Sequence, residues 1–133
     1  MSRKVDEGYY CHFELTLDII GGKWKPIILY YLGKYGALRY SEIRKLMPTI
    51  NERVLTRQLK ELTTSKLIER KVVGKVPLNV EYSLVDYGKT ILPILNELKQ
   101  WGKAYNKEIG KLKVLSENER KKIVETKKTI LDK

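Results

Sequence analysis

The sequence is poor in the residues that catalytic and metal sites usually require. It contains one cysteine and one histidine, Cys11 and His12, which excludes an intrachain disulfide and a cysteine-based zinc site. Gly21-Gly22-Lys23 lacks the rest of a phosphate-binding loop, and no set of residues has metal-ligand spacing. We therefore expect no enzyme, no metal and no other cofactor, in a protein of a reducing compartment, the cytoplasm.

Long apolar stretches are also missing. The longest run, Pro26 to Leu32, has seven residues, whereas a membrane-spanning helix needs about 18. The residues up to Glu7 are mainly polar and charged, with acidic residues at 6 and 7, which is unlike a signal peptide. We expect no membrane association and one compact domain at 11–105. A flexible segment at 1–10 would precede it, and a basic extension at 106–133, helical from 116, would follow it.

Charge is abundant and uneven. The formal net charge is +11, and between Lys34 and Val85 eleven Lys and Arg residues stand against five Asp and Glu residues. An excess of this sign suggests an anionic polymer or surface as the partner. Because about half of the excess lies in this central stretch, we expect the partner to bind there.

The central stretch predicts two short helices joined by a tight turn. Ser41 is a good N-cap for the first helix, and Pro48 cannot continue that helix. Asn51 is a good N-cap for the second helix. Two short helices with a turn between them are typical of a helix-turn-helix, whose second helix lies in the DNA major groove.

The second helix has two chemically different sides. At about 100° per residue, Leu55, Leu59 and Leu62 share one side. The opposite side carries cations, flanked by a hydroxyl, and these residues are Arg53, Thr56, Arg57 and Lys60. A cationic side can also be only a solvated face, and this alternative stays open on periodicity alone.

The residues after Leu67 change from helical spacing to the β-branched pattern of strands. Strands are predicted at 68–73 and 80–84, with turn residues between them. They form a β-hairpin wing behind the second helix, with cations at its tip and edge: Arg70, Lys71 and Lys75. An ordinary hairpin whose lysines protect its edge is the alternative. The predicted fold class is mainly α with a small β-hairpin wing, a winged helix-turn-helix.

Further helices flank this unit. We predict helices at 13–20, ended by a left-handed Gly21-Gly22 stop, and at 24–33. A long helix is predicted at 86–105, capped by Asp86 and kinked or loosened by Pro93. Its apolar arc is wider than one small domain needs, which suggests a partner helix from a second copy; a stripe that only covers the domain's own core is the alternative.

The chain resembles the HxlR family of winged helix-turn-helix transcriptional regulators. The resemblance covers residues 11–102 and rests on Leu17-Asp-Ile-Ile-Gly-Gly-Lys-Trp24, Arg39-Tyr-Ser-Glu-Ile, Leu55-Thr-Arg-Gln-Leu-Lys-Glu-Leu62 and Val80-Glu-Tyr-Ser-Leu84. It implies a homodimer on a pseudo-palindromic double-stranded DNA site. It also implies dimerisation through the first and the long helix, with Phe13, Leu17, Ile20, Ile91, Ile94, Leu95, Leu98 and Trp101 at the interface.

Two positions depart from the family pattern. His12 follows the cysteine where proline is common, and Asn79 precedes the second wing strand where arginine is common. Several family members sense electrophiles or oxidants through this cysteine, so the resemblance implies a possible sensor role for Cys11. The alternative is that Cys11 is a half-buried small hydrophobe.

The sequence therefore predicts a sequence-specific DNA-binding regulator of transcription. Non-specific chromosomal DNA binding, or a winged-helix module for protein interaction, are the alternative functions. The expected partners are double-stranded DNA and a second copy, and the candidate effector is a small electrophile or oxidant. The candidate DNA-binding residues are Ser41, Asn51, Arg53, Thr56, Arg57, Lys60, Arg70, Lys71 and Lys75.

Overall fold

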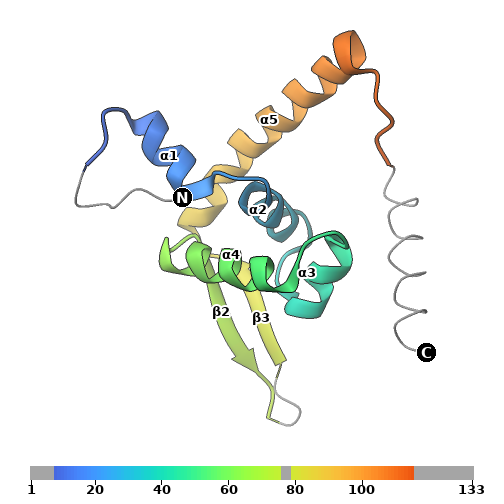
Figure 1. Ribbon diagram of the computed structural model, residues 1–133. Coiled ribbons are helices and arrows are strands. Elements are labelled where there is room, and N and C mark those ends of the chain that lie inside the picture. Colours follow the sequence, from blue (N-terminus) through green and yellow to red (C-terminus); the bar gives the residue numbers. More distant parts are fainter. Residues whose placement is uncertain (1–7, 76–78, 116–133) are drawn as a thin grey trace.

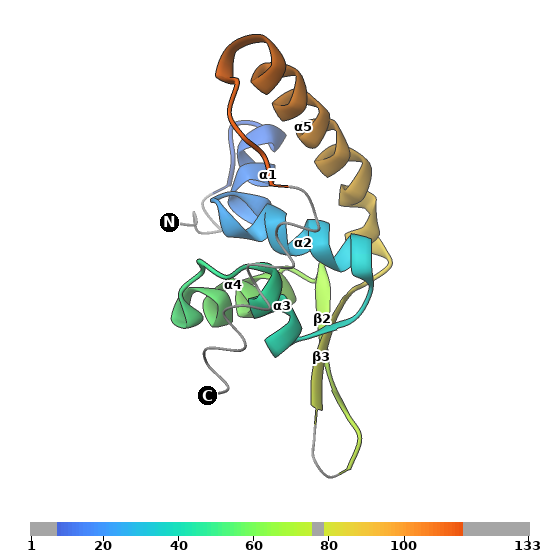
Figure 2. The same ribbon diagram turned by 90° about the vertical axis from the view of Figure 1, so that its right-hand side faces the viewer.

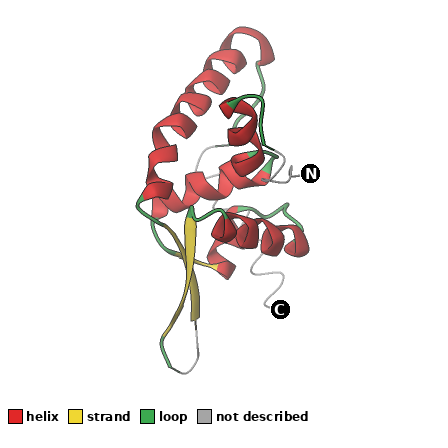
Figure 3. Ribbon diagram, turned by 90° about the vertical axis from the view of Figure 1, so that its left-hand side faces the viewer, coloured by secondary structure: helices red, strands yellow, loops and turns green. Residues whose placement is uncertain are grey.

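The computed structural model describes residues 8–75 and 79–115 (Figure 1). The predicted helix from 116 and residues 1–7 of the predicted flexible segment lie outside these residues. Helices and a small sheet make up the fold (Figure 3), as the winged helix-turn-helix prediction requires. No helix in the described part of the chain is long and apolar enough to cross a membrane.

The first two helices agree closely with prediction. α1 (His12–Ile20) follows Cys11 as N-cap, and its C-cap Gly21 is extended, with φ −71° and ψ 177°. The left-handed conformation belongs to Gly22, with φ 85°, so only one of the two glycines has the predicted role. α2 (Trp24–Tyr35) is two residues longer than predicted and ends at Gly36, another left-handed glycine.

The helix-turn-helix is formed by α3 (Tyr40–Leu46) and α4 (Glu52–Thr64). The prediction that Ser41 caps the first helix is wrong, because α3 begins at Tyr40, two residues before the start that a Ser41 cap would give. Its N-cap is Arg39, whose backbone N–H donates to the Glu42 carboxylate at 2.9 Å. Asn51 does cap α4, as predicted, by accepting from the backbone N–H of Arg53 at 2.8 Å.

The wing belongs to a three-stranded antiparallel sheet of order β1-β3-β2. β2 (Ile68–Val73) and β3 (Asn79–Leu84) form the predicted hairpin. β1 (Leu38–Arg39), where no strand was predicted, pairs with β3, with Leu38 opposite Tyr82. A two-residue strand has no recognisable periodicity, so only its pairing partner reveals it.

The long helix starts later than predicted. A 3₁₀ helix (Tyr87–Ile91) leads into α5 (Leu92–Tyr105), and a π-helical turn (Asn106–Gly110) follows it. Asp86 makes no capping hydrogen bond, so its predicted role is wrong. The predicted interior kink at Pro93 is wrong, because Pro93 lies in the first turn of α5, where its missing N–H is tolerated. The alternative prediction, a loosened start of the helix, agrees with the 3₁₀ segment before α5.

One apolar core joins these elements. Its fully buried side chains come from α2, α3, α4 and β2: Ile28, Leu29, Ile43, Leu55, Leu59, Leu62 and Ile68. α1 and α5 lie at one end of the molecule, while α3, α4 and the wing lie at the other (Figures 1 and 2). The two ends therefore present separate surfaces.

Candidate nucleic-acid interface

α4 presents the cationic face that the sequence predicts. Arg53, Thr56, Arg57 and Lys60 are exposed, while Leu55, Leu59 and Leu62 are at most 1% exposed. The leucines pack into the core and hold the helix in place. Because the two sides are opposite in direction, burial of the leucines fixes the outward direction of the cations.

The start of α4 is fixed by its cap. The Asn51 side-chain oxygen accepts from the N–H of Arg53 at 2.8 Å and of Val54 at 3.4 Å. A base contact by Asn51 would therefore use its amide NH₂ group, which is a donor. An asparagine that reads adenine normally uses both its side-chain oxygen and its NH₂ group. Asn51 could therefore make only the NH₂ half of this contact.

α3 and α4 are joined by contacts that sequence reasoning missed. The Tyr40 hydroxyl donates to the backbone carbonyl of Glu52 at 3.2 Å and lies 3.3 Å from the Thr56 hydroxyl oxygen. The Arg44 guanidinium lies 3.1 Å from the Glu52 carboxylate. These contacts set the angle between the two helices. Tyr40 and Arg44 occur within the helix-turn-helix, but no local pattern distinguishes a residue that holds one helix against another.

Most of the predicted DNA-binding cations are not paired with a carboxylate in the part of the chain that the structure describes. Within residues 8–75 and 79–115, Arg53, Lys60, Arg70 and Lys75 form no ion pair. Arg57 lies 3.9 Å from Glu61. This end of the protein thus carries positive charge that is not neutralised internally, and a polyanion would find it attractive. Ser41 is exposed on α3 and is not part of the α4 cationic face.

The structure separates two wing cations that the sequence grouped. Successive strand residues point to opposite faces, so Arg70 and Lys71 cannot face one partner together. Lys71 lies 3.4 Å from Glu69, two residues away on the same strand. Lys75 is exposed beyond Gly74, near the end of the hairpin.

A second surface is apolar and lies on α1 and α5. Of the residues that the resemblance assigns to a dimer interface, Phe13, Leu17, Ile94, Leu98 and Trp101 are exposed, Trp101 by 69%. Trp101 stacks on Tyr105 with ring centroids 5.5 Å apart. Ile91 is half-buried, and Ile20 and Leu95 belong to the protomer's own core, where they are unavailable to a second copy.

Cys11 is exposed at the start of α1. Its Sγ accepts from the backbone N–H of Phe13 at 3.4 Å, so the thiol serves as the helix N-cap. Exposure contradicts the half-buried alternative. The Lys23 ammonium lies 4.6 Å from the centre of the Trp24 ring. No group of residues in the described part of the chain could hold a metal ion.

Comparison with known proteins gives consistent matches. The family described as HxlR-like helix-turn-helix matches residues 19–109. The HTH-type transcriptional regulator YdeP of Bacillus subtilis is 48% identical over 84% of this chain and 86% of its own length. An HTH-type transcriptional regulator of Methanothermobacter thermautotrophicus is 49% identical over 75% of this chain and 76% of its own. The structure of the redox regulator HypR in its oxidized form matches with a TM-score of 0.67 and 45% identity, covering 71% of this chain and 96% of that one.

Proposed function

The chain belongs to the HxlR-like helix-turn-helix family of transcriptional regulators, and from this premise we propose that it binds a pseudo-palindromic double-stranded DNA site as a homodimer. It is a DNA-binding regulator and not an enzyme, and the expected winged helix-turn-helix fold is confirmed. Beyond the family, we propose that the DNA site is symmetric, that a second copy of the chain completes the dimer, and that the residues named below make the contacts. We also propose that the protein acts in the cytoplasm.

The observation that carries the proposal is the exposed cationic face of α4. Near the start of α4, Asn51, Arg53, Thr56 and Arg57 would read base edges, with arginine suited to guanine. Lys60, further along the helix, would contact a phosphate. Ser41 on α3 and the wing cations Arg70, Lys71 and Lys75 would add phosphate contacts, although Arg70 and Lys71 would not do so from the same face.

The exposed apolar residues of α1 and α5 support the homodimer. They lie at the end of the molecule opposite α4 and the wing (Figure 2), so a second copy could cover them without blocking DNA. A two-fold dimer would place two α4 helices about 34 Å apart, in successive major grooves. The operator would accordingly have two related half-sites.

The decisive experiment compares two DNA fragments of equal length. The purified protein is titrated against its own upstream region and against a shuffled version, from low to physiological salt. We expect a preference for the natural sequence that persists at physiological salt. Equal binding that disappears as salt rises would instead indicate non-specific, electrostatic DNA binding, and no binding to either fragment would favour a protein-interaction module.

We further propose that Cys11 makes DNA binding responsive to oxidants or electrophiles. The thiol is exposed at the start of α1, where a small oxidant or electrophile can reach it. HypR, one of the solved structures that match, is described as a redox regulator in its oxidized form. Modification would also alter the sulfur that accepts from the Phe13 N–H, at the point where α1 begins.

The test uses Cys11→Ser, which keeps an acceptor at the helix N-cap and removes the thiol. Diamide or methylglyoxal should weaken operator binding by the wild-type protein and leave the variant unaffected. If both proteins lost affinity equally, the reagent would be acting elsewhere and the sensor role would be excluded.

A further inference from the structure

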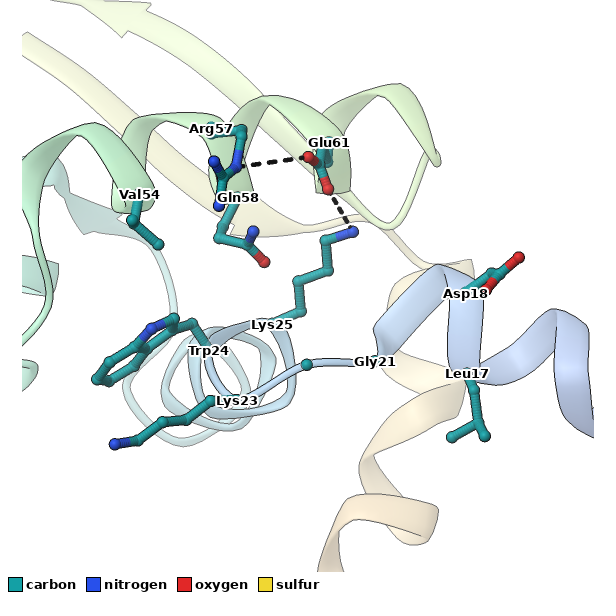
Figure 4. Close-up of a pocket in the computed structure, with 11 residues that line it drawn as sticks. Leu17, Asp18, Gly21, Lys23, Trp24, Lys25, Val54, Arg57, Gln58 and Glu61 are labelled. Carbon is teal, nitrogen blue, oxygen red and sulfur yellow. Dashed lines mark ion pairs between the residues drawn. The ribbon is translucent and has the colours of Figure 1, made fainter. Parts of the chain in front are cut away.

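A cleft of about 650 Å³ lies where α1, the start of α2 and α4 meet (Figure 4). On one side of it, Lys25 extends from α2 toward α4, and its ammonium lies 2.6 Å from Oε2 of Glu61. The Lys25 side chain is 9% exposed and the Glu61 side chain 41%. The pair therefore connects a buried cation to a carboxylate at the edge of the α4 surface.

Lys25 occupies a position that disfavours a cation in two ways. It lies in the first turn of α2, where the positive end of the helix dipole repels positive charge. It is also the one buried charged residue in the described part of the chain, and burial removes its hydration. The short contact with Glu61 compensates for both effects.

The same carboxylate also faces the proposed DNA-binding surface. Its second oxygen, Oε1, lies 3.9 Å from Nε of the Arg57 guanidinium, which is beyond hydrogen-bonding distance. In Figure 4 the carboxylate stands between the two cations. Arginine four residues before glutamate is also the weaker order for a helical ion pair. Glu61 is thus held closely by Lys25 and only loosely by Arg57.

We propose that Lys25 is a positioning residue for DNA recognition: by neutralising Glu61, it leaves the Arg57 guanidinium available to DNA. The inference rests on the proposed DNA-binding function of α4. Without the Lys25 charge, Arg57 would be the only cation among the described residues that forms an ion pair with Glu61. The carboxylate would then attract Arg57 along the helix and would repel nearby phosphates.

The test measures the affinity of three variants for the operator fragment at fixed salt. Lys25→Met should weaken binding roughly fivefold, the effect of a partly exposed ion pair. Adding Glu61→Gln to this variant should restore affinity to within about twofold of wild type, because the competing carboxylate is gone. Lys23→Met, which loses the same charge in the same cleft without contacting Glu61, is the matched control and should bind as wild type does.

A second measurement separates positioning from a purely structural role. In an Arg57→Ala background, Lys25→Met should change affinity by less than about twofold, since the guanidinium that it protects is absent. Lys25→Gln is measured in the same way as Lys25→Met, so that a folding defect in one variant is not mistaken for a loss of DNA affinity. Circular dichroism verifies the fold of each protein.

Three results would overturn the inference. They are unchanged affinity in Lys25→Met, failure of Glu61→Gln to restore it, and an equal loss with and without Arg57. Failure of the wild-type protein to bind DNA is a distinct result, since it would remove the proposed function itself and the inference with it.

Discussion

α4 and α5 are both amphipathic, yet the protomer buries the whole apolar side of α4 and only part of the apolar side of α5. The leucines of α4 are entirely buried, and its exposed side is polar and cationic. On α5, Leu95 is buried, but Ile94, Leu98 and Trp101 are more than half exposed. The comparison shows that an apolar stripe predicts that a helix face is buried, but does not say whether the protomer's own core or another molecule covers it. The exposed side of each helix is suited to a different proposed partner: a polyanion for α4 and an apolar surface for α5.

The largest expected effect is on the free energy of unfolding, and it compares a buried leucine of α4 with an exposed leucine of α5. Leu59→Ala should lower the free energy of unfolding by about 2–5 kcal/mol, because it leaves a cavity in the core. Leu98→Ala, at a side chain 55% exposed, should cost less than about 0.5 kcal/mol in a dissociated protomer. Urea unfolding in dilute protein measures both. Similar losses would mean that α5 is as well buried as α4.

The next effect concerns self-association. Trp101→Ala should weaken the proposed dimer by about 2–4 kcal/mol, because a large exposed aromatic residue is a frequent hot spot. Gln100→Ala, at the neighbouring exposed polar residue of α5, is the control. Sedimentation equilibrium measures the association constant. A protein that is monomeric throughout, or a Trp101→Ala variant that associates normally, would show that this surface has another partner.

A smaller effect examines the cationic side of α4. Arg57→Ala should cost about 1–3 kcal/mol of operator affinity and relax the preference at one base pair. Arg57→Lys keeps the charge but loses the two-pronged guanidinium, so it should also relax the preference while retaining more affinity. Binding to a set of operators with single base-pair changes tests this. A uniform loss across the set would assign Arg57 to phosphate contact.

The smallest effect concerns the wing. Lys75→Ala should weaken binding to all sequences alike and reduce the slope of log affinity against log salt by about one. Lys103→Ala, on α5 at the other end of the molecule (Figure 2), should leave the slope unchanged. A salt titration of wild type and both variants is sufficient. An unchanged slope in Lys75→Ala would remove this residue from the proposed interface.

Local chemistry predicts most of the elements. The Asn51 cap, the spacing of Leu55, Leu59 and Leu62, and the β-branched hairpin each depend on residues close in sequence. The errors at Ser41 and Asp86 arise because several nearby residues can start a helix, and tertiary contacts choose between them. β1 was missed because a two-residue strand can be recognised only from its hydrogen-bonded pairing with β3.

The sequence by itself determined the family, the helix-turn-helix with its wing, and which side of α4 is cationic, because these depend on periodicity and capping over short distances. Only the tertiary structure decided which apolar residues are buried in the protomer's own core: Ile20 and Leu95 are buried, whereas Leu98 and Trp101 are exposed. It alone brought Lys25 to Glu61 and Tyr40 to Thr56. The physical reason is that burial and ion pairing between helices depend on how separate elements pack, which local periodicity does not encode.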